Sequence, residues 1–290
     1  MAKLPENIRA ACEAVLNAKV EAVFHIGGGD ISQALRLETA KGAFFIKVNT
    51  KTFAGAMFAA EAKGLQLLAH TKTFRVPTLI GKSEAEENPA FLLLENIESG
   101  NPRPDFWAQF GERLADLHRC KSDHFGLDHN NFIGSLPQNN ALHSNWVDFY
   151  SQCRLLPQIQ LAAAEGKLTA QDHQSFDLLF AKFPALLPEE LPSLIHGDLW
   201  NGNFLCDKGG APVLIDPAVC FASREMDLAM ALLFGGFDRK FYEAYQLAYP
   251  LMPGWTERTD LYQLYYLMVH VNLFGGGYIQ SVRQILRRFV

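Results

Sequence analysis

The sequence predicts an α+β protein with a small β-rich N-terminal lobe and a larger, mostly helical C-terminal lobe. Short apolar runs typical of strands dominate up to about residue 97, and helical periodicity dominates afterwards. Between the two regions lies ESGNPRP, residues 98–104, a stretch rich in residues that break helices and strands. We therefore expect one lobe over residues 1–97 and the other over residues 98–290.

The N-terminal lobe is expected to contain a five-stranded sheet with a helix on it. Apolar residues recur at helical spacing in the first 20 residues, which predicts an amphipathic helix before the sheet. Strands are expected in AVFHIGGGD, ALRLET and GAFFIKVN, followed by a helix over about 54–70 and strands in TLIGKS and AFLLLENI. Because side chains alternate along a strand, Phe45, Lys47 and Asn49 share one face of GAFFIKVN.

Six later segments have helical periodicity and are expected to form the second lobe. They are DFWAQFGERLADLHRC, SNWVDFYSQCRLLPQIQLAAAEG, TAQDHQSFDLLFAKF, REMDLAMALLF, DRKFYEAYQLAY and RTDLYQLYYLMVHVNLF. Within this helical region, NFLC and PVLI lie on either side of the turn DKGG and predict a short β-hairpin.

The composition excludes several classes of protein. The chain has 290 residues and a formal net charge of -5, without a block of Lys or Arg, so neither a nucleic acid nor a membrane is an expected partner. No apolar run reaches the roughly 18–20 residues that span a bilayer. The five cysteines are scattered and include no C-x-x-C pair, which favours a reducing, cytoplasmic environment without a disulfide framework or zinc site. The sequence does not fix the oligomeric state, and a monomer is slightly favoured.

The stretch HGDLWNGN, residues 196–203, concentrates polar side chains just before the predicted hairpin. In an antiparallel hairpin the start of the first strand lies beside the end of the second, so Asn203 and Asp216 should be neighbours. An amide oxygen and a carboxylate suit Mg²⁺, which binds a few protein oxygens together with substrate phosphates. Asp198 precedes Asn203 by five residues. The spacing D-x-x-x-x-N with a later Asp matches the phosphoryl-transfer pattern, in which the first Asp accepts the proton of the acceptor hydroxyl.

The glycine-rich segment between the first two strands is a candidate phosphate-binding loop. Glycine lets main-chain N–H groups approach phosphates closely. The segment is neither a Walker A motif nor a complete G-x-G-x-x-G, because Ser32 stands where the last glycine would be, and a simple hairpin turn also explains it. The candidate nucleotide-binding residues here are Gly27, Gly28, Gly29, Asp30, Ile31 and Ser32.

Lys47 and Glu61 are predicted to form an ion pair. On the helix after the third strand, Glu61 lies in one stripe with Phe58, Leu65 and Leu68. A carboxylate in an apolar stripe is costly unless it is paired, and Lys47 is the nearest sensible partner. Such a Lys–Glu pair orients ATP phosphates in kinase-like folds. The alternative is that Glu61 lies at the edge of the stripe and reaches solvent.

The segments HGDLWNGN, IDPAVCFASREMDLAMALLFGGF and LFGGGY resemble the fructosamine kinase (ketosamine-3-kinase) family, within the aminoglycoside/choline-type phosphotransferase clan. The resemblance covers essentially the whole chain. It implies a protein-kinase-like fold, ATP and Mg²⁺ as cofactors, and phosphorylation of a ketosamine at the 3-hydroxyl of its sugar. The substrate would be a small ketosamine or a glycated amine or protein, and the role would be repair of glycation.

The resemblance also assigns roles to individual residues. Asp198 would accept the proton, Asn203 and Asp216 would bind magnesium, Lys47 would contact the α- and β-phosphates, and Glu61 would orient Lys47. The main chain of Glu95, Asn96 and Ile97 would bind adenine. By this resemblance, the flat ring of Trp200 would pack against the sugar, although packing within the protein core also explains the residue. Asp227 is expected to brace the catalytic loop, and Glu225 is a candidate counter-charge for the substrate amine.

Two rival functions remain. Another small-molecule kinase of the clan would act on an aminoglycoside, choline or homoserine, although the late helices offer few acidic residues for a polycationic antibiotic. A catalytically inactive binding protein on a kinase-like fold would have lost one of the key residues, yet all five are present: Lys47, Glu61, Asp198, Asn203 and Asp216. Only ten residues separate Asp216 from Asp227, which leaves no room for the long activation loop of protein kinases.

Overall fold

The structure is a computed structural model that describes residues 2–27 and 31–290. The chain forms two compact units. The first contains the residues up to Gln109 together with Gly202–Pro217, and the second contains Phe110–Asn201 and Ala218–Val290. The first unit is therefore assembled from two separate stretches of chain. The boundary of the functional lobes between residues 97 and 98 stays a prediction.

A five-stranded antiparallel sheet forms the centre of the first unit, as predicted. Its strands are β1 (Val20–His25), β2 (Gln33–Thr39), β3 (Gly42–Asn49), β4 (Leu79–Lys82) and β5 (Ala90–Glu95). Their order across the sheet is β1-β2-β3-β5-β4. β3 covers the whole predicted segment GAFFIKVN, and Ile46 and Val48, two positions apart on one face, are buried.

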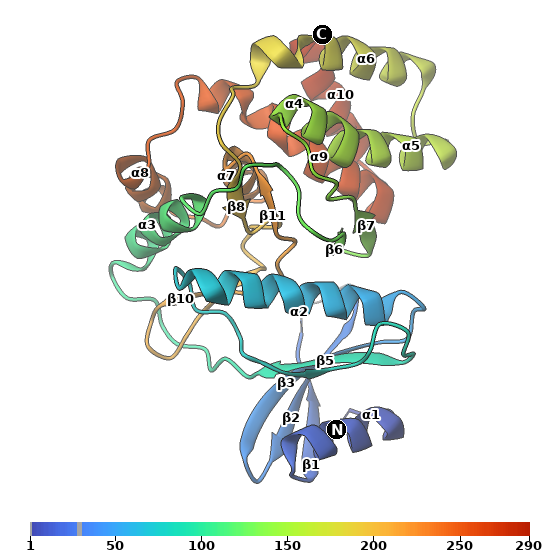
Figure 1. Ribbon diagram of the computed structural model, residues 1–290, viewed down its shortest axis with the longest axis vertical. Coiled ribbons are helices and arrows are strands. Elements are labelled where there is room, and N and C mark those ends of the chain that lie inside the picture. The colour runs from blue at the N-terminus through green and yellow to red at the C-terminus, as the bar shows by residue number, and fades with distance from the viewer. Residues whose placement is uncertain (1, 28–30) are drawn as a thin grey trace. The chain divides into compact units, whose positions relative to one another are not determined.

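Two helices cover the opposite faces of this sheet (Figure 1). α1 (Glu6–Leu16) buries Ile8 and Cys12 against a face that includes Ile46 and Val48 of β3. α2 (Ala54–Thr71) packs against β4 and β5. Because side chains alternate along β3, the face that carries Lys47 is the one covered by α2. The predicted sheet with its long helix is confirmed.

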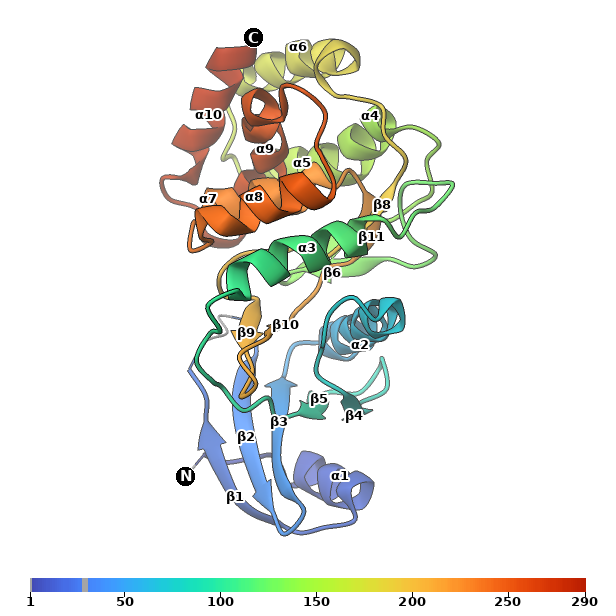
Figure 2. The same cartoon turned by 90° about the vertical axis from the view of Figure 1, so that its left-hand side faces the viewer.

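The predicted hairpin is formed by β9 (Phe204–Cys206) and β10 (Pro212–Leu214) and belongs to the first unit (Figure 2). Main-chain hydrogen bonds fasten it there. Leu214 N donates to Arg75 O at 3.1 Å, and Gly100 N donates to Cys206 O at 3.0 Å. The segments that flank the sheet thus hold the hairpin in place.

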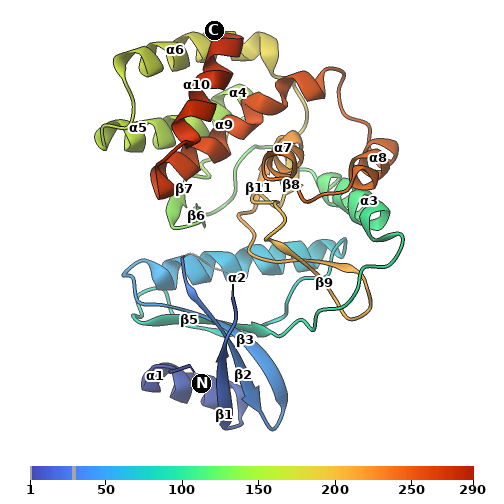
Figure 3. The same ribbon diagram turned by 180° about the vertical axis from the view of Figure 1, so that it is seen from behind.

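The second unit is mostly helical, as predicted. Its elements include α3 (Phe106–His118, whose first turn belongs to the first unit), α6 (Ala170–Leu186), α7 (Glu225–Leu233), α8 (Arg239–Ala248), α9 (Trp255–Phe274) and α10 (Tyr278–Phe289). α7 and α10 pack against α9 (Figure 3), whose side chains Leu264, Met268 and Val271 are almost fully buried. Among the described residues, no helix is both long and apolar enough to cross a membrane.

Two pairs of three-residue strands in the second unit were not predicted. β6 (Asn131–Ile133) pairs with β7 (Leu136–Gln138), and β8 (Ser193–Ile195) pairs with β11 (Cys220–Ala222). Strands this short have too few residues to show an alternating pattern, and β8 and β11 are distant in sequence. The stretch 196–201, which contains the predicted proton acceptor Asp198, begins directly after β8.

The segment 144–166, expected as one helix, is interrupted. α4 (Trp146–Phe149) is followed by a π-helix, η1 (Tyr150–Leu155), and then by α5 (Leu156–Ala164). Tertiary contacts account for the wider turn: the hydroxyl of Tyr150 donates to Leu261 O, and the guanidinium of Arg154, 2% exposed, donates to Asn140 Oδ1 at 2.7 Å. Local periodicity carries no information about such distant partners.

Candidate active site

Lys47 forms the predicted ion pair with Glu61 in the first unit. Lys47 Nζ lies 2.8 Å from Glu61 Oε1, and both side chains are 12% exposed. The same ammonium group lies 2.7 Å from Asp216 Oδ1. Burial alone would lower the pKa of Lys47, but the carboxylates of Asp216 and Glu61 outweigh this effect and raise it. The side chain therefore stays a cation. Glu61 does not take the solvent-facing alternative.

The hairpin brings Asn203 and Asp216 to the same end, as predicted. Leu214 pairs with Phe204, and Ile215 N donates to Asn203 O at 3.1 Å, so Asp216 follows directly on the residue opposite Asn203. Asp216 has a left-handed main chain, with φ of 54°, and its side chain is 40% exposed. Asn203 is 5% exposed. An amide and a carboxylate at one hairpin end provide the hard oxygen donors that magnesium prefers.

These residues fit a site for magnesium and the phosphates of ATP. The described residues contain no group of three or more His, Cys, Asp or Glu that would hold a metal unaided. Magnesium bound with a nucleotide needs only one or two protein oxygens, because phosphates supply others. The Lys47 ammonium, next to Asp216, is a cation suited to the phosphates themselves.

The loop that carries Asp198 belongs to the second unit, and its main chain is held on several sides. Gly197 has a φ of 84°, and a Cβ there would overlap the carbonyl oxygen of Ala218. His196 O accepts a hydrogen bond from Ala218 N at 2.9 Å, and Gly197 O accepts one from the Tyr266 hydroxyl at 3.1 Å. Only glycine combines this dihedral angle with such close packing. The carboxylate of Asp198 itself is half-buried.

Asp227 braces this loop, as expected. Its side chain is fully buried, and its two oxygens accept hydrogen bonds from His196 N at 2.7 Å and Gly197 N at 2.9 Å. The carboxylate thus binds the two main-chain amides that precede Asp198. Charge-assisted bonds of this kind are stronger than neutral ones.

His118 is a further residue of this site that was not predicted from the sequence. Its Nε2 lies 3.2 Å from Asp227 Oδ2, and its Nδ1 lies 2.8 Å from the hydroxyl of Tyr245. The ring is completely buried, and burial lowers its pKa, while Asp227 opposes this shift. The available signal was a polar side chain on the apolar face of α3, next to Leu117 and in register with Leu114.

Glu225 and Trp200 also lie in the second unit. Glu225 is 2% exposed, and both of its oxygens accept hydrogen bonds from Arg258, at 2.6 and 2.8 Å. Its charge is already matched within the chain, so the structure favours a structural role over contact with a substrate amine. Trp200 is half-buried, packs on the helical core and meets Phe234 edge-on at 6.2 Å between ring centroids.

The predicted adenine-binding segment begins at Glu95, the last residue of β5. Asn96 and Ile97 continue beyond the strand and are half-buried. The carboxylate of Glu95 binds Arg75 and accepts hydrogen bonds from the main-chain N–H of Thr78 at 3.2 Å and from its hydroxyl at 3.0 Å. These contacts engage the side chain of Glu95. Adenine binding by the main chain stays a prediction.

Only part of the glycine loop can be compared with the structure. Gly27 is exposed, whereas Gly28, Gly29 and Asp30 lie outside the described residues. Ile31 and Ser32 are held by hydrogen bonds from Asn49.

The predicted site residues divide between the two units. Lys47, Glu61, Asn203 and Asp216 are in the first, and Asp198, Trp200 and Glu225 are in the second. In sequence, four residues separate Asp198 from Asn203.

A model of the fructosamine kinase family matches residues 5–290. The chain belongs to the fructosamine kinase family. Curated relatives match this chain over most of their length. A probable ketoamine kinase of Enterococcus faecium is 39% identical, with 94% of this chain and 96% of that protein covered. The ketosamine-3-kinase of Mus musculus is 35% identical, with 93% and 95% covered. The chloroplastic protein-ribulosamine 3-kinase of Arabidopsis thaliana is 36% identical, with 90% and 80% covered.

Solved structures confirm the predicted protein-kinase-like fold. The crystal structure of a candidate fructosamine-3-kinase from Thermobifida fusca YX-ER1 has a TM-score of 0.87 at 33% identity and covers 98% of each chain. An aminoglycoside phosphotransferase has a TM-score of 0.65 at 15% identity, again with 98% of each chain covered. The second likeness concerns the fold alone.

Proposed function

We propose that this fructosamine kinase family member is an ATP-dependent kinase that phosphorylates the 3-hydroxyl of the sugar in a ketosamine. The observation that carries the proposal is the family match over residues 5–290, which spans both units. The curated relatives named ketosamine-3-kinase and protein-ribulosamine 3-kinase support this acceptor class. A cytoplasmic role in the repair of glycated amines or proteins belongs to the same proposal.

The chemistry that we assign to each residue follows from its charge and its partners. The carboxylate of Asp198 accepts the proton of the acceptor hydroxyl, and Asp227 and Gly197 keep the main chain around Asp198 in place. Lys47 binds the α- and β-phosphates, and Glu61 holds its ammonium group in position. Positioning and electrostatic stabilisation supply most of the rate enhancement in this reaction class.

Asn203 and Asp216 are the residues that we assign to magnesium. When bound, the metal neutralises charge that develops on the phosphates during transfer. Use of a nucleotide is consistent with the fold, since an aminoglycoside phosphotransferase of the same fold has been crystallised with ADP and hygromycin B. The exposed part of Asp216 and the neighbouring Lys47 give phosphate and metal a common site.

The test is ATP turnover with ribulosamine and fructosamine conjugates of a blocked lysine, followed by phosphorus NMR of the product. We expect ADP release that depends on magnesium, with the new phosphate on O3 of the sugar. A parallel panel contains an aminoglycoside, choline and homoserine. Turnover confined to that panel would assign the protein to another branch of the clan. Absence of turnover with every acceptor, despite ATP binding, would contradict the proposed acceptor class.

A further inference from the structure

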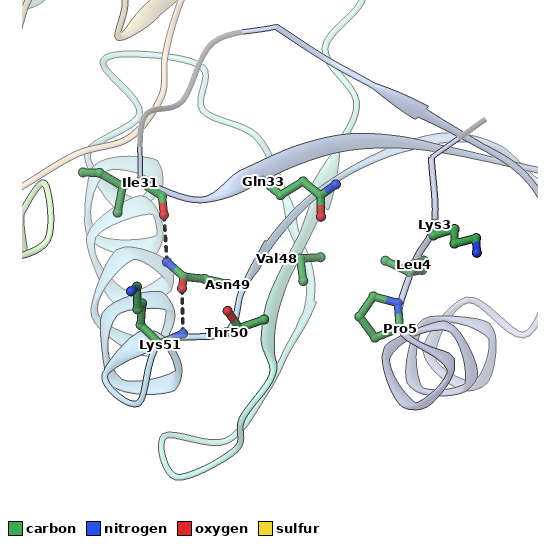
Figure 4. Close-up of a pocket in the computed structure, with 9 residues that line it drawn as sticks. All are labelled: Lys3, Leu4, Pro5, Ile31, Gln33, Val48, Asn49, Thr50 and Lys51. Atoms are coloured by element: carbon green, nitrogen blue, oxygen red, sulfur yellow. Dashed lines mark hydrogen bonds between the residues drawn. The ribbon is translucent and has the colours of Figure 1, made fainter.

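Asn49, the last residue of β3, joins three segments that the function needs. Its Nδ2 donates to Ile31 O and to Ser32 Oγ, each at 3.0 Å, and its Oδ1 accepts from Lys51 N at 2.9 Å. Figure 4 shows the bonds to Ile31 and Lys51 along the wall of a pocket of about 530 Å³. The side chain is 6% exposed, so these partners replace water.

The chemistry of the partners fixes the orientation of the amide. Ile31 contributes a carbonyl oxygen, which only accepts, and Lys51 contributes a main-chain N–H, which only donates. The nitrogen of Asn49 must therefore face Ile31, and its second N–H reaches Ser32. Because Ser32 Oγ accepts this bond, its own proton stays available to donate to a phosphate oxygen.

These bonds extend the sheet beyond its last pair. The ladder between β2 and β3 ends at Gln33 and Val48. Ile31 and Ser32 come directly before Gln33. Among the hydrogen bonds described for these two residues, those to β3 come from the side chain of Asn49. Asn49 is two residues from Lys47 and shares its face of the strand. The end of the glycine loop is thus fixed on the same face as the phosphate-binding cation.

The bond to Lys51 connects Asn49 to the helix of Glu61 as well. Ala54, the first residue of α2, donates its N–H to Lys51 O at 3.0 Å. A single buried amide therefore connects the exit of the glycine loop, the strand of Lys47 and the start of the helix of Glu61.

We propose that Asn49 is a positioning residue for the triphosphate of ATP, which acts by holding Ile31 and Ser32 in register with Lys47. The proposal rests on the proposed function, since it assumes that ATP is the nucleotide. Asn49 does not touch the reacting atoms. Its loss should weaken ATP binding and leave binding of the sugar acceptor unchanged.

The test compares Asn49→Leu and Asn49→Ala, which remove the amide without adding charge, with wild type. ATP affinity is measured by calorimetry in magnesium, and the KM values for ATP and for the acceptor are measured separately. We expect both the Kd and the KM for ATP to rise about tenfold or more, the value of one or two hydrogen bonds, with the acceptor KM within about twofold. An unchanged ATP affinity in both variants would overturn the proposal.

Thr39→Val is the matched control at the other end of the same strand pair. The Thr39 hydroxyl, 8% exposed, donates to Gly42 O at 3.0 Å and accepts from Lys41 N at 3.1 Å. This variant should lose stability without a change in ATP affinity. If Thr39→Val weakens ATP binding as much as Asn49→Ala does, both variants act through general destabilisation of the sheet, and the positioning role of Asn49 is refuted.

A double-mutant cycle tests whether Asn49 acts on ATP affinity through Ser32. Ser32→Ala should weaken ATP binding in wild type but much less in Asn49→Ala, because the hydroxyl is no longer held there. Fully additive effects would show that Asn49 does not act through Ser32. Failure of wild type to bind ATP at all would count against the proposed function instead, and the two failures are thus distinguishable.

Discussion

The loop that contains Asp198 is held by residues that do not take part in the proposed chemistry. Asp227 binds the amides of His196 and Gly197, and Tyr266 binds the carbonyl of Gly197. Asp198 is thus placed by main-chain bonds on the two residues before it. Because these bonds involve the neighbouring main chain, we expect the loop to keep its structure when the carboxylate of Asp198 is replaced by an amide.

Asp198→Asn should lower kcat by roughly 10²–10⁴-fold, the usual value of a positioned general base. Asparagine has nearly the same shape, so ATP affinity and stability should stay close to those of wild type. A coupled ADP-release assay gives kcat, and calorimetry gives the affinity. Full turnover by this variant would remove Asp198 from the role of base.

His118 should make stability depend on pH. Burial holds the pKa of its imidazole below the unfolded value of about 6.5, so the unfolded chain binds a proton more readily than the native protein. The contribution to stability is therefore complete above about pH 6.5 and is lost as the pH falls below it. Denaturant unfolding between pH 7.5 and 5 should show this loss in the free energy of unfolding of wild type. His118→Gln, which cannot gain the proton, should show a smaller loss over the same range. Equal losses in the two proteins would exclude a contribution of His118 to the pH dependence.

At the level of elements, the short strand pair β8–β11 leads directly into the loop that contains Asp198. Gly197 lies two residues beyond the end of β8, where a left-handed main chain and the carbonyl of Ala218 leave no space for a side chain. The strands have three residues each, so their pairing alone is weak. Close packing at Gly197 and the bonds to Asp227 compensate for this.

Gly197→Ala should destabilise the protein by roughly 1–3 kcal/mol or more, since it adds a steric overlap to the strain of a left-handed residue. Gly166→Ala is the matched control, because Gly166 has a φ of 68° but no atom within 4 Å of the place that a Cβ would occupy. The difference in unfolding free energy between the two variants measures the cost of the steric overlap at position 197. Equal losses would show that the dihedral angle alone is responsible.

The elements also show what the sequence could reveal. β3 is a run of strand-forming residues, α2 has an apolar stripe that contains Glu61, and the turn DKGG marks the β9–β10 hairpin, so these elements and the Lys47–Glu61 pair were predictable. The π-helix at Tyr150–Leu155 was not, because it depends on distant partners such as Leu261. The contact of His118 with Asp227 spans 109 positions and has no local signature.

For the whole molecule, ligand binding and stability should be linked. A ligand that binds only the native protein stabilises it by about 2.7 kcal/mol at a concentration 100 times its Kd. ATP with magnesium should therefore raise the free energy of unfolding of wild type by about this amount, and ATP with a chelator should do much less. Asp216→Ala should abolish the magnesium-dependent part. Equal stabilisation of this variant would exclude Asp216 from the metal site.

The division of the first unit has a consequence for how the protein is made. The residues up to Gln109 emerge from the ribosome first. The segment that completes their unit, Gly202–Pro217, emerges only after the whole of Phe110–Asn201. At typical rates of translation this delay is on the order of 5–20 s. During that time the nascent chain already has Lys47 and Glu61 but lacks Asn203 and Asp216. The proposed site for magnesium and nucleotide can therefore be complete only late in synthesis, after both parts of the unit have left the exit tunnel.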